Sequence, residues 1–350
     1  MTPAGEVRLA RVYFRCSACT EGSYALDERL GIDGRYSPHV QRLICLASAS
    51  WSFEVASNRL AELCGVRVCN TTIREIAQQH GAAMLSWQRE DPEAVRTFRE
   101  ADGNVEFTTD GTCVNTTEGW REMKVGIFSK RQAGEPARPE DWCTRTLPKP
   151  HVRVCFAAIE KSERFGSRWK AWRKRLGLGD VSNVTVLADG AKWIWEEQRK
   201  HLTHADGVLD VFHALEHVAA SAKQLYGETQ AAADWTDAGR GLLLSEGFAG
   251  IGRHISESLV RTRSPAKRSA LKSLQAYLQP HEHHLAYSQR LAEGKSIGSG
   301  QVEGACKNLI GRRLKQTGAR WRPRRINRMT GLCSLLYSHQ WTAYWDQAAP

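Results

Sequence analysis

The sequence has no long apolar run and no segment that resembles a secretory signal peptide. A helix that crosses a bilayer needs about 20 mostly apolar residues, so we expect neither a membrane-spanning segment nor a membrane partner. The ten cysteines come without an export signal. They therefore indicate free thiols in a reducing compartment, the cytoplasm, rather than a disulfide framework.

Acidic residues are scarce in one part of the chain. The net charge is +11, but residues 1–100 contain twelve Lys/Arg and twelve Asp/Glu, so the positive excess lies beyond residue 100. The densest stretch has one acid, Glu303, and ten basic residues: Lys295, Lys307, Arg312, Arg313, Lys315, Arg320, Arg322, Arg324, Arg325 and Arg328. Such a segment favours a polyanionic partner, and we expect the eight basic side chains between positions 307 and 325 to bind DNA. A solubilising face or an RNA contact would have the same composition.

The chain is long enough to bury one large core and one or two small modules. Changes in composition and periodicity divide it into five segments. They are residues 1–35, a partial zinc-ribbon-like segment; 36–100, a helical module; 101–220, the first part of an α/β core; 221–295, an all-helical insertion; and 296–350, the end of the core and a basic tail.

The first segment contains Cys16 and Cys19 in the run YFRCSACTEG. This spacing would supply two thiolates to a structural Zn²⁺, which is almost always four-coordinate. Cys45, Cys64 and Cys69 are not spaced as a second pair. A zinc site and a pair of reduced, unliganded thiols therefore remain alternatives.

The second segment has the pattern of three helices. Ser37 followed by Pro38 is a typical helix start, since serine caps the helix and proline suits its first position. A second helix is expected from Phe53 to Leu63, before Gly65, and a third from Thr71 to His80. This arrangement is compatible with a helix-turn-helix that reads DNA and equally with a three-helix module that does not.

From residue 105 the pattern changes to strands. Runs rich in β-formers at 105–114, 120–132 and 151–160 precede a basic helix, a strand that ends at Asp189, another helix and another strand. This order fits the ribonuclease-H-like fold, a mixed sheet whose first and fourth strands are neighbours. Asp110, at the end of the first run, would then share one cleft with Asp189. The alternative for Asp189 is a cap on the helix that follows it.

Residues 221–293 lack strand signals and predict the helical insertion, in which we expect the histidine-rich stretch 280–284 to be an exposed turn. The core resumes at GSGQVEG, residues 298–304, and enters a helix that ends near Lys315. Glu303 lies in the first turn, where an acid favours the helix dipole without any catalytic role. It also borders the apolar stripe of this helix. Its carboxylate would therefore project past the edge of the surface on which the helix packs.

Three short motifs resemble those of a known enzyme family. Asp110 in TTDGT, Asp189 in LADGAKWIW and Glu303 in GSGQVEGACK are similar to the three acids of the DDE transposases of bacterial insertion sequences. Within these, the resemblance is to the Mutator-related group and nearest to its IS-Kra family. It extends from residue 13 to about residue 336.

A fourth motif supports the resemblance. Asp210 and His213 in DVFH match an Asp-x-x-His that these transposases carry after the fifth strand. We expect the pair to be hydrogen-bonded and to brace the last strand against the insertion, with metal binding as the alternative. Members of the family usually carry a further CxxC before the YFRC segment. We therefore expect an incomplete zinc ribbon and a truncated, relic element.

The resemblance implies an activity, cofactors and partners. The activity is metal-dependent cleavage and strand transfer at the ends of an insertion sequence, with two Mg²⁺ or Mn²⁺ ions held by carboxylates. Asp110 would bridge both ions, while Asp189 and Glu303 would each hold one. The partner would be double-stranded DNA, both the terminal inverted repeats of the element and the target DNA. Several copies of the chain would assemble on this DNA, in the nucleoid of a bacterial cytoplasm. A structure-selective nuclease on the same fold and a catalytically dead DNA-binding remnant remain alternatives.

Overall fold

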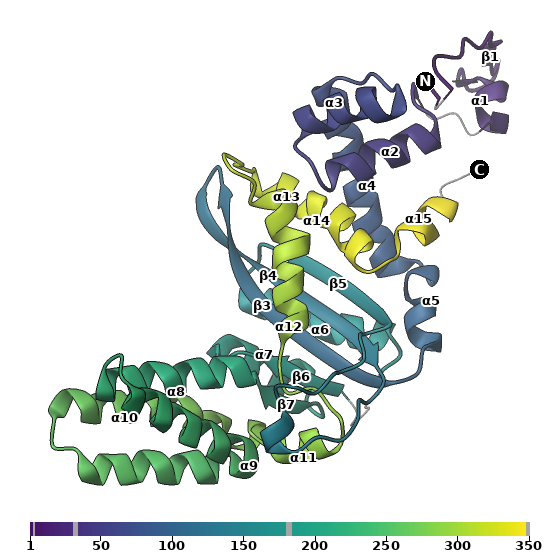
Figure 1. The fold of residues 1–350 in the computed structure, drawn as a ribbon. Helices are drawn as coiled ribbons and strands as arrows, with labels where there is room; N and C mark the ends of the chain where they lie inside the picture. Colours follow the sequence, from purple (N-terminus) through teal and green to yellow (C-terminus); the bar gives the residue numbers. More distant parts are fainter. Residues whose placement is uncertain (3, 31–33, 180–183, 348–350) are drawn as a thin grey trace.

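The computed structural model describes residues 1–2, 4–30, 34–179 and 184–347. A five-stranded mixed sheet lies at its centre, with the strand order β5-β4-β3-β6-β7 (Figure 1). The strands are β3 (Asn104–Thr116), β4 (Gly119–Arg131), β5 (Val152–Ala158), β6 (Val184–Ala188) and β7 (Asp206–Leu209). Their inner residues are mostly β-branched and aromatic, as expected for strands covered on both faces.

The first and fourth strands of this sheet are parallel neighbours. β3 pairs with β6 from Val105↔Val184 to Thr108↔Leu187. β4 and β5 extend the sheet antiparallel on one side, and β7 extends it parallel on the other. The predicted chain order of three strands, helix, strand, helix and strand is therefore confirmed, and so is the adjacency of strands one and four.

The prediction that the first strand ends at Asp110 was wrong. β3 continues to Thr116 because its antiparallel partner β4 pairs with it throughout, with Asp110 opposite Val125 and Gly111 opposite Lys124. An Asp-Gly pair turns the chain only where no partner strand holds it extended. Because β6 stops at Ala188, the second half of β3 forms a hairpin with β4 that projects past the sheet (Figure 1).

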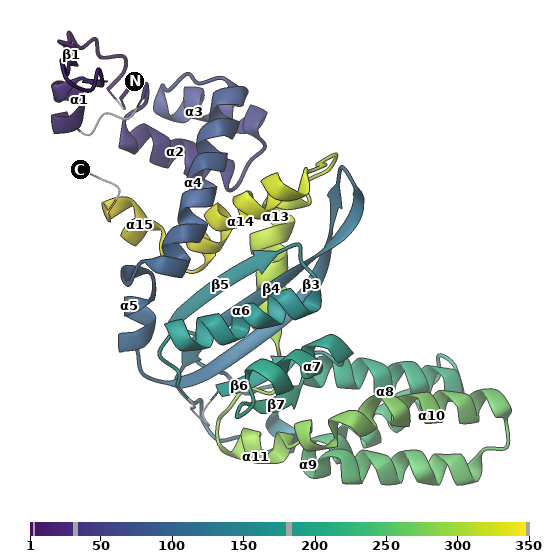
Figure 2. The ribbon, with the colours of Figure 1, turned by 180° about the vertical axis from the view of Figure 1, so that it is seen from behind.

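Helices cover both faces of the sheet. One face packs on α6 (Ser162–Arg175) and α7 (Lys192–His201), with Phe107 and Phe128 facing Trp169 in a shared apolar core. The other face packs on α12 (Gly300–Ala305) and α14 (Pro323–Tyr337), where Val125 and Ile127 join a second core (Figures 1 and 2). Successive strand residues point to opposite faces, which is why Ile127 and Phe128 belong to different cores.

The helical module consists of α2 (Pro38–Ser48), α3 (Phe53–Cys64), α4 (Asn70–Glu90) and α5 (Glu93–Glu100). The Ser37 hydroxyl accepts a hydrogen bond from the N–H of Val40 at 3.4 Å, and Gly65 ends α3 with φ of 65°, as predicted. The third helix does not end at His80. It continues for about three further turns to Glu90, past Gly81.

Gly81 continues the helix because α14 lies against it. A Cβ atom at position 81 would lie 2.3 Å from the carbonyl oxygen of Arg328, and one at Gly331 would lie 2.2 Å from the carbonyl oxygen of Gly81. The two backbones therefore touch where α4 crosses α14. This contact joins the helical module to the sheet, since α14 also packs on β5.

We predict that Gly331→Ala lowers the free energy of unfolding by about 1–3 kcal/mol, because the new methyl group would overpack the α4–α14 crossing. Gly241 is the matched control, since it lies in a helix with open space around its Cα. There, the change to Ala should raise stability by up to about 1 kcal/mol. Chemical denaturation monitored by circular dichroism measures both, and equal effects of the two substitutions would contradict the close crossing.

The insertion is helical, as predicted. It contains α8 (Val211–Tyr226), α9 (Gln230–Arg261), α10 (Pro265–Leu278), the 3₁₀ segment η2 (Gln279–His284) and α11 (Tyr287–Ala292). It begins at α8, about ten residues earlier than the predicted boundary. The prediction that residues 280–284 form an exposed turn was wrong for His281. This side chain is buried against Trp195, with ring centroids 5.2 Å apart.

Shorter elements complete the described chain. The amino-terminal segment has the hairpin β1 (Phe14–Arg15) and β2 (Gly22–Ser23), followed by α1 (Ala25–Leu30). Elsewhere lie the 3₁₀ turn η1 (Pro139–Asp141), the π-helical segment η3 (Cys306–Gly311), α13 (Arg312–Leu314) and α15 (Trp341–Gln347). In the part of the chain that the structure describes, no helix combines the length and apolar character needed to cross a membrane.

Candidate active site

Asp110 and Asp189 lie on neighbouring parallel strands. The last paired residues of β3 and β6 are Thr108 and Leu187, so Asp110 and Asp189 follow at the same level, two residues further along each chain. Burial raises the pKa of Asp110 above its usual value. The N–H of Gly111 opposes this shift, whereas the negative charge of Asp189 adds to it. The two carboxylates are therefore close enough to interact electrostatically.

Asp189 accepts hydrogen bonds in the turn before α7, whose N-cap residue is Ala191. Its Oδ1 accepts a hydrogen bond from the N–H of Ala191 at 3.0 Å, and its carbonyl oxygen accepts one from Nε1 of Trp195 at 2.8 Å. The alternative that Asp189 is only a helix cap was therefore wrong, because its side chain bonds to Ala191, which precedes the first residue of α7. The hydrogen bond from Ala191 fixes the orientation in which Asp189 meets Asp110.

Asp210 and His213 form the expected hydrogen-bonded pair. Asp210 is fully buried at the start of α8, and its Oδ1 accepts from the N–H of His213 at 2.9 Å and from Nδ1 at 3.2 Å. Burial would raise the pKa of Asp210, but hydrogen bonds from His213 and Ser299 outweigh it and lower the pKa. In turn, the hydrogen bond to Asp210 raises the pKa of His213 to about 9, with the charges of Asp210 and Asp189 adding to the effect. At neutral pH, His213 is therefore an imidazolium among carboxylates.

Asp210 also holds the chain where it returns from the insertion. Its Oδ2 accepts a hydrogen bond from the backbone N–H of Ser299. One residue further, the N–H of Val211 donates to the carbonyl oxygen of Ile297 at 3.0 Å. The start of α8 and the loop before α12 are thus bonded to each other, although the whole insertion separates them in sequence.

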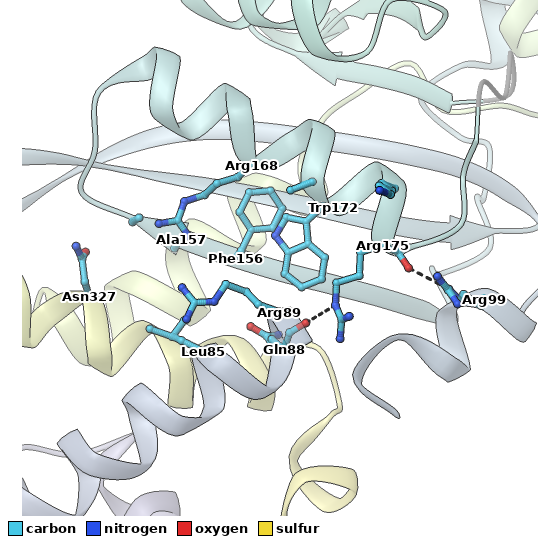
Figure 3. Close-up of a pocket in the computed structure, with 13 residues that line it drawn as sticks. Leu85, Gln88, Arg89, Arg99, Phe156, Ala157, Arg168, Trp172, Arg175 and Asn327 are labelled. Atoms are coloured by element: carbon cyan, nitrogen blue, oxygen red, sulfur yellow. Dashed lines mark hydrogen bonds between the residues drawn. The ribbon is translucent and has the colours of Figure 1, made fainter. Parts of the chain in front are cut away.

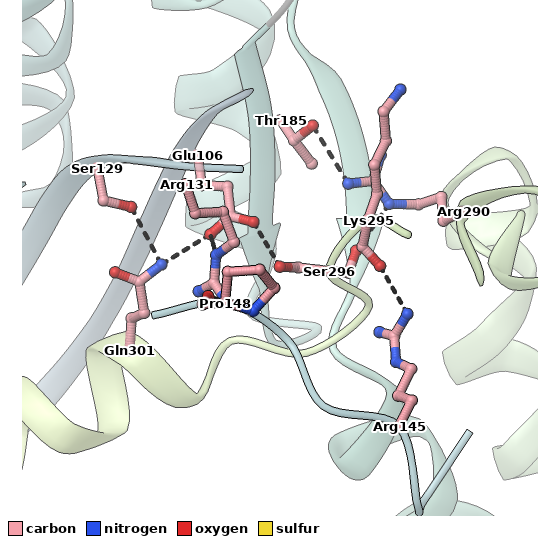
Figure 4. A network of polar contacts seen from close by, with 10 residues as sticks. All are labelled: Glu106, Ser129, Arg131, Arg145, Pro148, Thr185, Arg290, Lys295, Ser296 and Gln301. Atoms are coloured by element: carbon pink, nitrogen blue, oxygen red, sulfur yellow. Dashed lines mark hydrogen bonds and ion pairs between the residues drawn. The ribbon is translucent and has the colours of Figure 1, made fainter. Parts of the chain in front are cut away.

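A buried carboxylate on β3 fixes the first turn of α12. Glu106 accepts hydrogen bonds from Ser296 Oγ, from Nε2 of Gln301 at 2.7 Å and from Nε of Arg131 at 2.9 Å (Figure 4). Gln301 Nε2 also donates to Ser129 Oγ on β4 at 3.0 Å. Because Gln301 lies two residues before Glu303, these bonds set the position from which Glu303 projects.

Two arginines extend this network to the loop before α12. Arg290 donates from Nε to the carbonyl oxygen of Ser296 at 2.8 Å and from a guanidinium nitrogen to Thr185 Oγ1 at 3.3 Å. Arg145 donates to the carbonyl oxygen of Lys295 at 2.9 Å (Figure 4). The loop is therefore tied both to β6 and to the segment between β4 and β5.

Glu303 lies close to the Asp210–His213 pair. Ligand atoms of Asp210, His213 and Glu303 all lie within 4.8 Å of one another, so these three could hold a metal ion. Among the described residues, no other group of three possible metal ligands is this close together. In particular, Asp110, Asp189 and Glu303 do not form such a group. The three predicted acids gather at one end of the sheet without converging on a single point.

Cys306, one turn after Glu303, contacts Asp110. Its Sγ lies 3.8 Å from Asp110 Oδ2 and donates to it. Burial raises the pKa of the thiol to about 12, and the charges of Asp110 and Glu303 contribute. Cys306 belongs to the apolar stripe of the helix in the sequence, and no local signal distinguished it as a neighbour of the acids.

The insertion places Tyr277 next to Gly190, directly after Asp189. A Cβ atom at Gly190 would lie 2.4 Å from the Tyr277 ring, and His217 stacks on that ring with centroids 3.6 Å apart. Burial raises the pKa of Tyr277 to about 12, and the negative charges of Asp189 and Asp210 add to this increase. The glycine directly after Asp189 was the one sequence signal for this contact.

Comparison with known proteins adds no assignment. No protein-family model matches the sequence, and no curated protein shows significant similarity to it. The site must therefore be interpreted from its own chemistry.

The basic segment is mostly exposed, with one exception. Arg313 is 3% exposed, donates from Nε to the carbonyl oxygen of Ser48 at 2.5 Å and lies over the rings of Phe53 and Trp321. Burial lowers its pKa to about 10. Its prediction as a DNA contact was wrong, because consecutive helix positions face different directions and this one faces the core. The exposed or half-buried predicted contacts are Lys307, Arg312, Lys315, Arg320, Arg322, Arg324 and Arg325.

Cys16 and Cys19 lie between β1 and β2, in a hairpin that is far from β6 (Figure 1). Both are exposed, and the N–H groups of Cys19 and Ala18 lower the pKa of the Cys16 thiol. This geometry places two cysteines on one short hairpin, as in a zinc knuckle. Among the described residues they belong to no group of three metal-binding side chains, so zinc binding stays a prediction.

We predict a pH-dependent stabilisation by His213. Its pKa in the folded protein, about 9, exceeds the usual value of 6.5. The stabilisation is therefore fully present below pH about 6.5 and is lost as the pH rises through about 9. The measurement is the difference between the denaturation midpoints of the wild type and His213→Gln from pH 6 to pH 10, with a chelator present. A difference that stays constant over this range would contradict a charged His213.

Proposed function

We propose that the protein is a DNA transposase of the DDE type. The observation that carries the proposal is the position of Asp110 and Asp189 at the same level of two neighbouring parallel strands, with Glu303 one helical turn before Cys306, which contacts Asp110. Chemistry in open α/β sheets is placed where parallel strands end, as Asp110 and Asp189 are. The substrate would be the ends of an insertion sequence, which the enzyme cuts and joins to target DNA.

The topology supports a ribonuclease-H-like core. The strand order β5-β4-β3-β6-β7, with β4 antiparallel to its neighbours, has the first and fourth strands side by side. The helical insertion between β7 and α12 returns the chain to the opposite face of the same strands. In this arrangement the third acid approaches the first two from a helix that lies across the sheet.

The donor set fits hard divalent cations. Mg²⁺ and Mn²⁺ take oxygen ligands, which Asp110, Asp189 and Glu303 would supply. Asp110 and Asp189 repel each other, and part of the raised pKa of Asp110 comes from this repulsion, so positive charge would stabilise this end of the sheet. When bound, two such ions would stabilise charge on the attacking and leaving oxygens of an in-line displacement at phosphorus.

The side chains around the acids have positioning roles. Asp210 keeps the return loop closed through Ser299 and holds the Nδ1 proton of His213. The His213 imidazolium offsets part of the negative charge of Asp110 and Asp189. Glu106 and Gln301 fix the helix turn that presents Glu303.

The DNA partner is proposed from charge. Exposed basic side chains follow directly after Glu303 in η3, α13 and the start of α14, next to the projecting β3–β4 hairpin (Figure 1). We propose that this surface binds the phosphates of the element ends and of the target, with several copies of the chain assembled on the DNA.

Glu303→Gln, Asp110→Asn and Asp189→Asn should each abolish both cleavage and strand joining. Each substitution keeps the side-chain shape and removes one anionic metal ligand, so the rate should fall by about two orders of magnitude or more while stability changes little. The assay is cleavage and joining of labelled duplexes from the DNA that flanks the gene, in Mg²⁺. Double substitutions should be barely worse than single ones.

Glu257→Gln serves as the matched control, since Glu257 lies exposed on α9 away from the acids. It should cleave at the wild-type rate. Wild-type cleavage by Glu303→Gln would remove Glu303 from the site and with it most of the support for a transposase. Cleavage by the wild type without any joining would instead favour a structure-selective nuclease.

Replacing Arg320, Arg322 and Arg324 by Ala should weaken DNA binding regardless of DNA sequence. Each lost phosphate contact reduces the slope of log binding constant against log salt by about 0.9. A titration of a labelled duplex at several salt concentrations measures this slope. An unchanged slope would mean that the segment faces solvent or another protein.

The charge-matched control removes three exposed arginines of α9, Arg240, Arg253 and Arg261. It changes the net charge equally, so it separates a local contact from a general charge effect. The control variant should keep a salt slope near that of the wild type, whereas the Arg320, Arg322 and Arg324 variant should show a smaller slope.

A further inference from the structure

A cavity of about 540 Å³ lies at the edge of the sheet formed by β5, opposite the edge formed by β7. It is enclosed by β5, α6 and the end of α4, with Arg99 of α5 at its rim (Figure 3). Ligand pockets in proteins measure roughly 300–1,000 Å³. The cavity thus has the size of a small-molecule site.

The floor of the cavity is flat, aromatic and apolar. The rings of Phe156 and Trp172 are stacked, with centroids 5.6 Å apart and an angle of 23° between their planes. Ala157 and Ala171 also line the cavity and contribute only small side chains to it. Such a floor suits a flat ring that stacks on an indole.

The rim of the cavity is positively charged. Five cationic side chains line it: Arg89, Arg99, Arg168, Lys174 and Arg175. No described residue that lines it is acidic. A cavity with a positive rim and an apolar floor favours a ligand that combines an anion with a flat apolar body.

Two of the five cations have carboxylate partners. Arg168 pairs with Glu160, and Arg89 lies 4.0 Å from Glu90. No ion pair between described residues involves the other three. Their charge is therefore available to a ligand.

Arg99 and Arg175 are held next to each other by backbone carbonyls. Arg99 donates from Nε to the carbonyl oxygen of Arg175 at 2.9 Å, and Arg175 donates to the carbonyl oxygens of Gln88 and Asp91 (Figure 3). Burial lowers the pKa of Arg175, and the positive charge of Arg99 lowers it further, while Asp91 and Glu90 oppose this. Two cations fixed side by side repel each other, and a bound anion would relieve that repulsion.

We propose that this cavity binds a nucleoside phosphate, with the base on Trp172 and Phe156 and the phosphate between Arg99, Lys174 and Arg175. A phosphate dianion matches several cations better than a single carboxylate does. The base supplies the flat body that the floor requires. The ligand is either a free nucleotide or the unpaired end of a DNA strand, since both present the same groups.

This proposal is independent of the proposed transposase activity. The cavity lies at the edge of the sheet away from β6 and Asp189, and it uses none of the acids. Binding of dAMP can be measured without Mg²⁺ and without element DNA. Glu303→Gln should leave it unchanged, so the two proposals fail separately.

The experiment is calorimetric titration of the full chain with dAMP, deoxyadenosine and inorganic phosphate. We expect dAMP to bind at least about tenfold more tightly than either part alone, because stacking and phosphate contacts add. Ala171→Phe fills the cavity from an exposed helix position and should abolish binding. Lys174→Ala removes one unpaired cation and should weaken binding by about tenfold. Arg164→Gln, on the same helix but outside the cavity, should bind as the wild type does.

Each outcome decides the proposal. Equal binding of inorganic phosphate and dAMP, full dAMP binding by Ala171→Phe, or equal binding of a hexaglutamate peptide would overturn it. If Ala171→Phe does not fold, the dAMP affinity of Lys174→Ala is compared with that of Arg164→Gln. Equal affinities of these two variants would likewise overturn the proposal. A 5′-phosphorylated tetranucleotide distinguishes the two sources: tighter binding than dAMP, lost in Ala171→Phe, indicates a DNA strand, and equal or weaker binding indicates a free nucleotide.

Discussion

The buried carboxylate of Asp210 is the interaction on which the architecture depends. It caps the helix by which the chain leaves the sheet, and it accepts the N–H of Ser299 where the chain returns. A buried carboxylate without hydrogen bonds would be strongly unfavourable. The backbone N–H groups of His213 and Ser299 that donate to Asp210 are therefore held in place together with it. The long insertion is therefore closed at its base like a loop, and its helices can be added without moving Glu303 relative to β3.

Charge balance is the second constraint on this end of the sheet. Several carboxylates lie near one another in partly buried surroundings, and the negative charge of Asp189 adds to the raised pKa of Asp110. The structure offsets them with the His213 imidazolium and with hydrogen bonds, such as those from Gly111 to Asp110 and from Ala191 to Asp189.

Close backbone contacts make one body of segments that look separate in the sequence. Gly81 and Gly331 bring the helical module against α14, and the unpaired edge of β5 is covered by side chains of that same helix region. There, Ser338 Oγ accepts the N–H of Cys155, and the Asn327 side chain accepts the N–H of Ile159. Covering an edge in this way prevents pairing with other chains. The cationic cavity lies between this covered edge and α6, so its shape depends on both modules.

The sequence by itself determined the strands and their order along the chain, because alternating and helical periodicity and helix caps are local signals. The assignment of Asp110, Asp189 and Glu303 to one catalytic site stays a prediction. It misplaced the end of the first strand and of the third helix, since a partner strand and a facing helix overrode the local stop signals at Asp110 and Gly81. It also assigned Arg313 to DNA, because composition does not show which way a side chain points. Glu106, Cys306 and Tyr277 became part of the site only in the tertiary structure. Their roles arise from contacts between residues far apart in the chain, and such contacts leave no pattern in the neighbouring sequence.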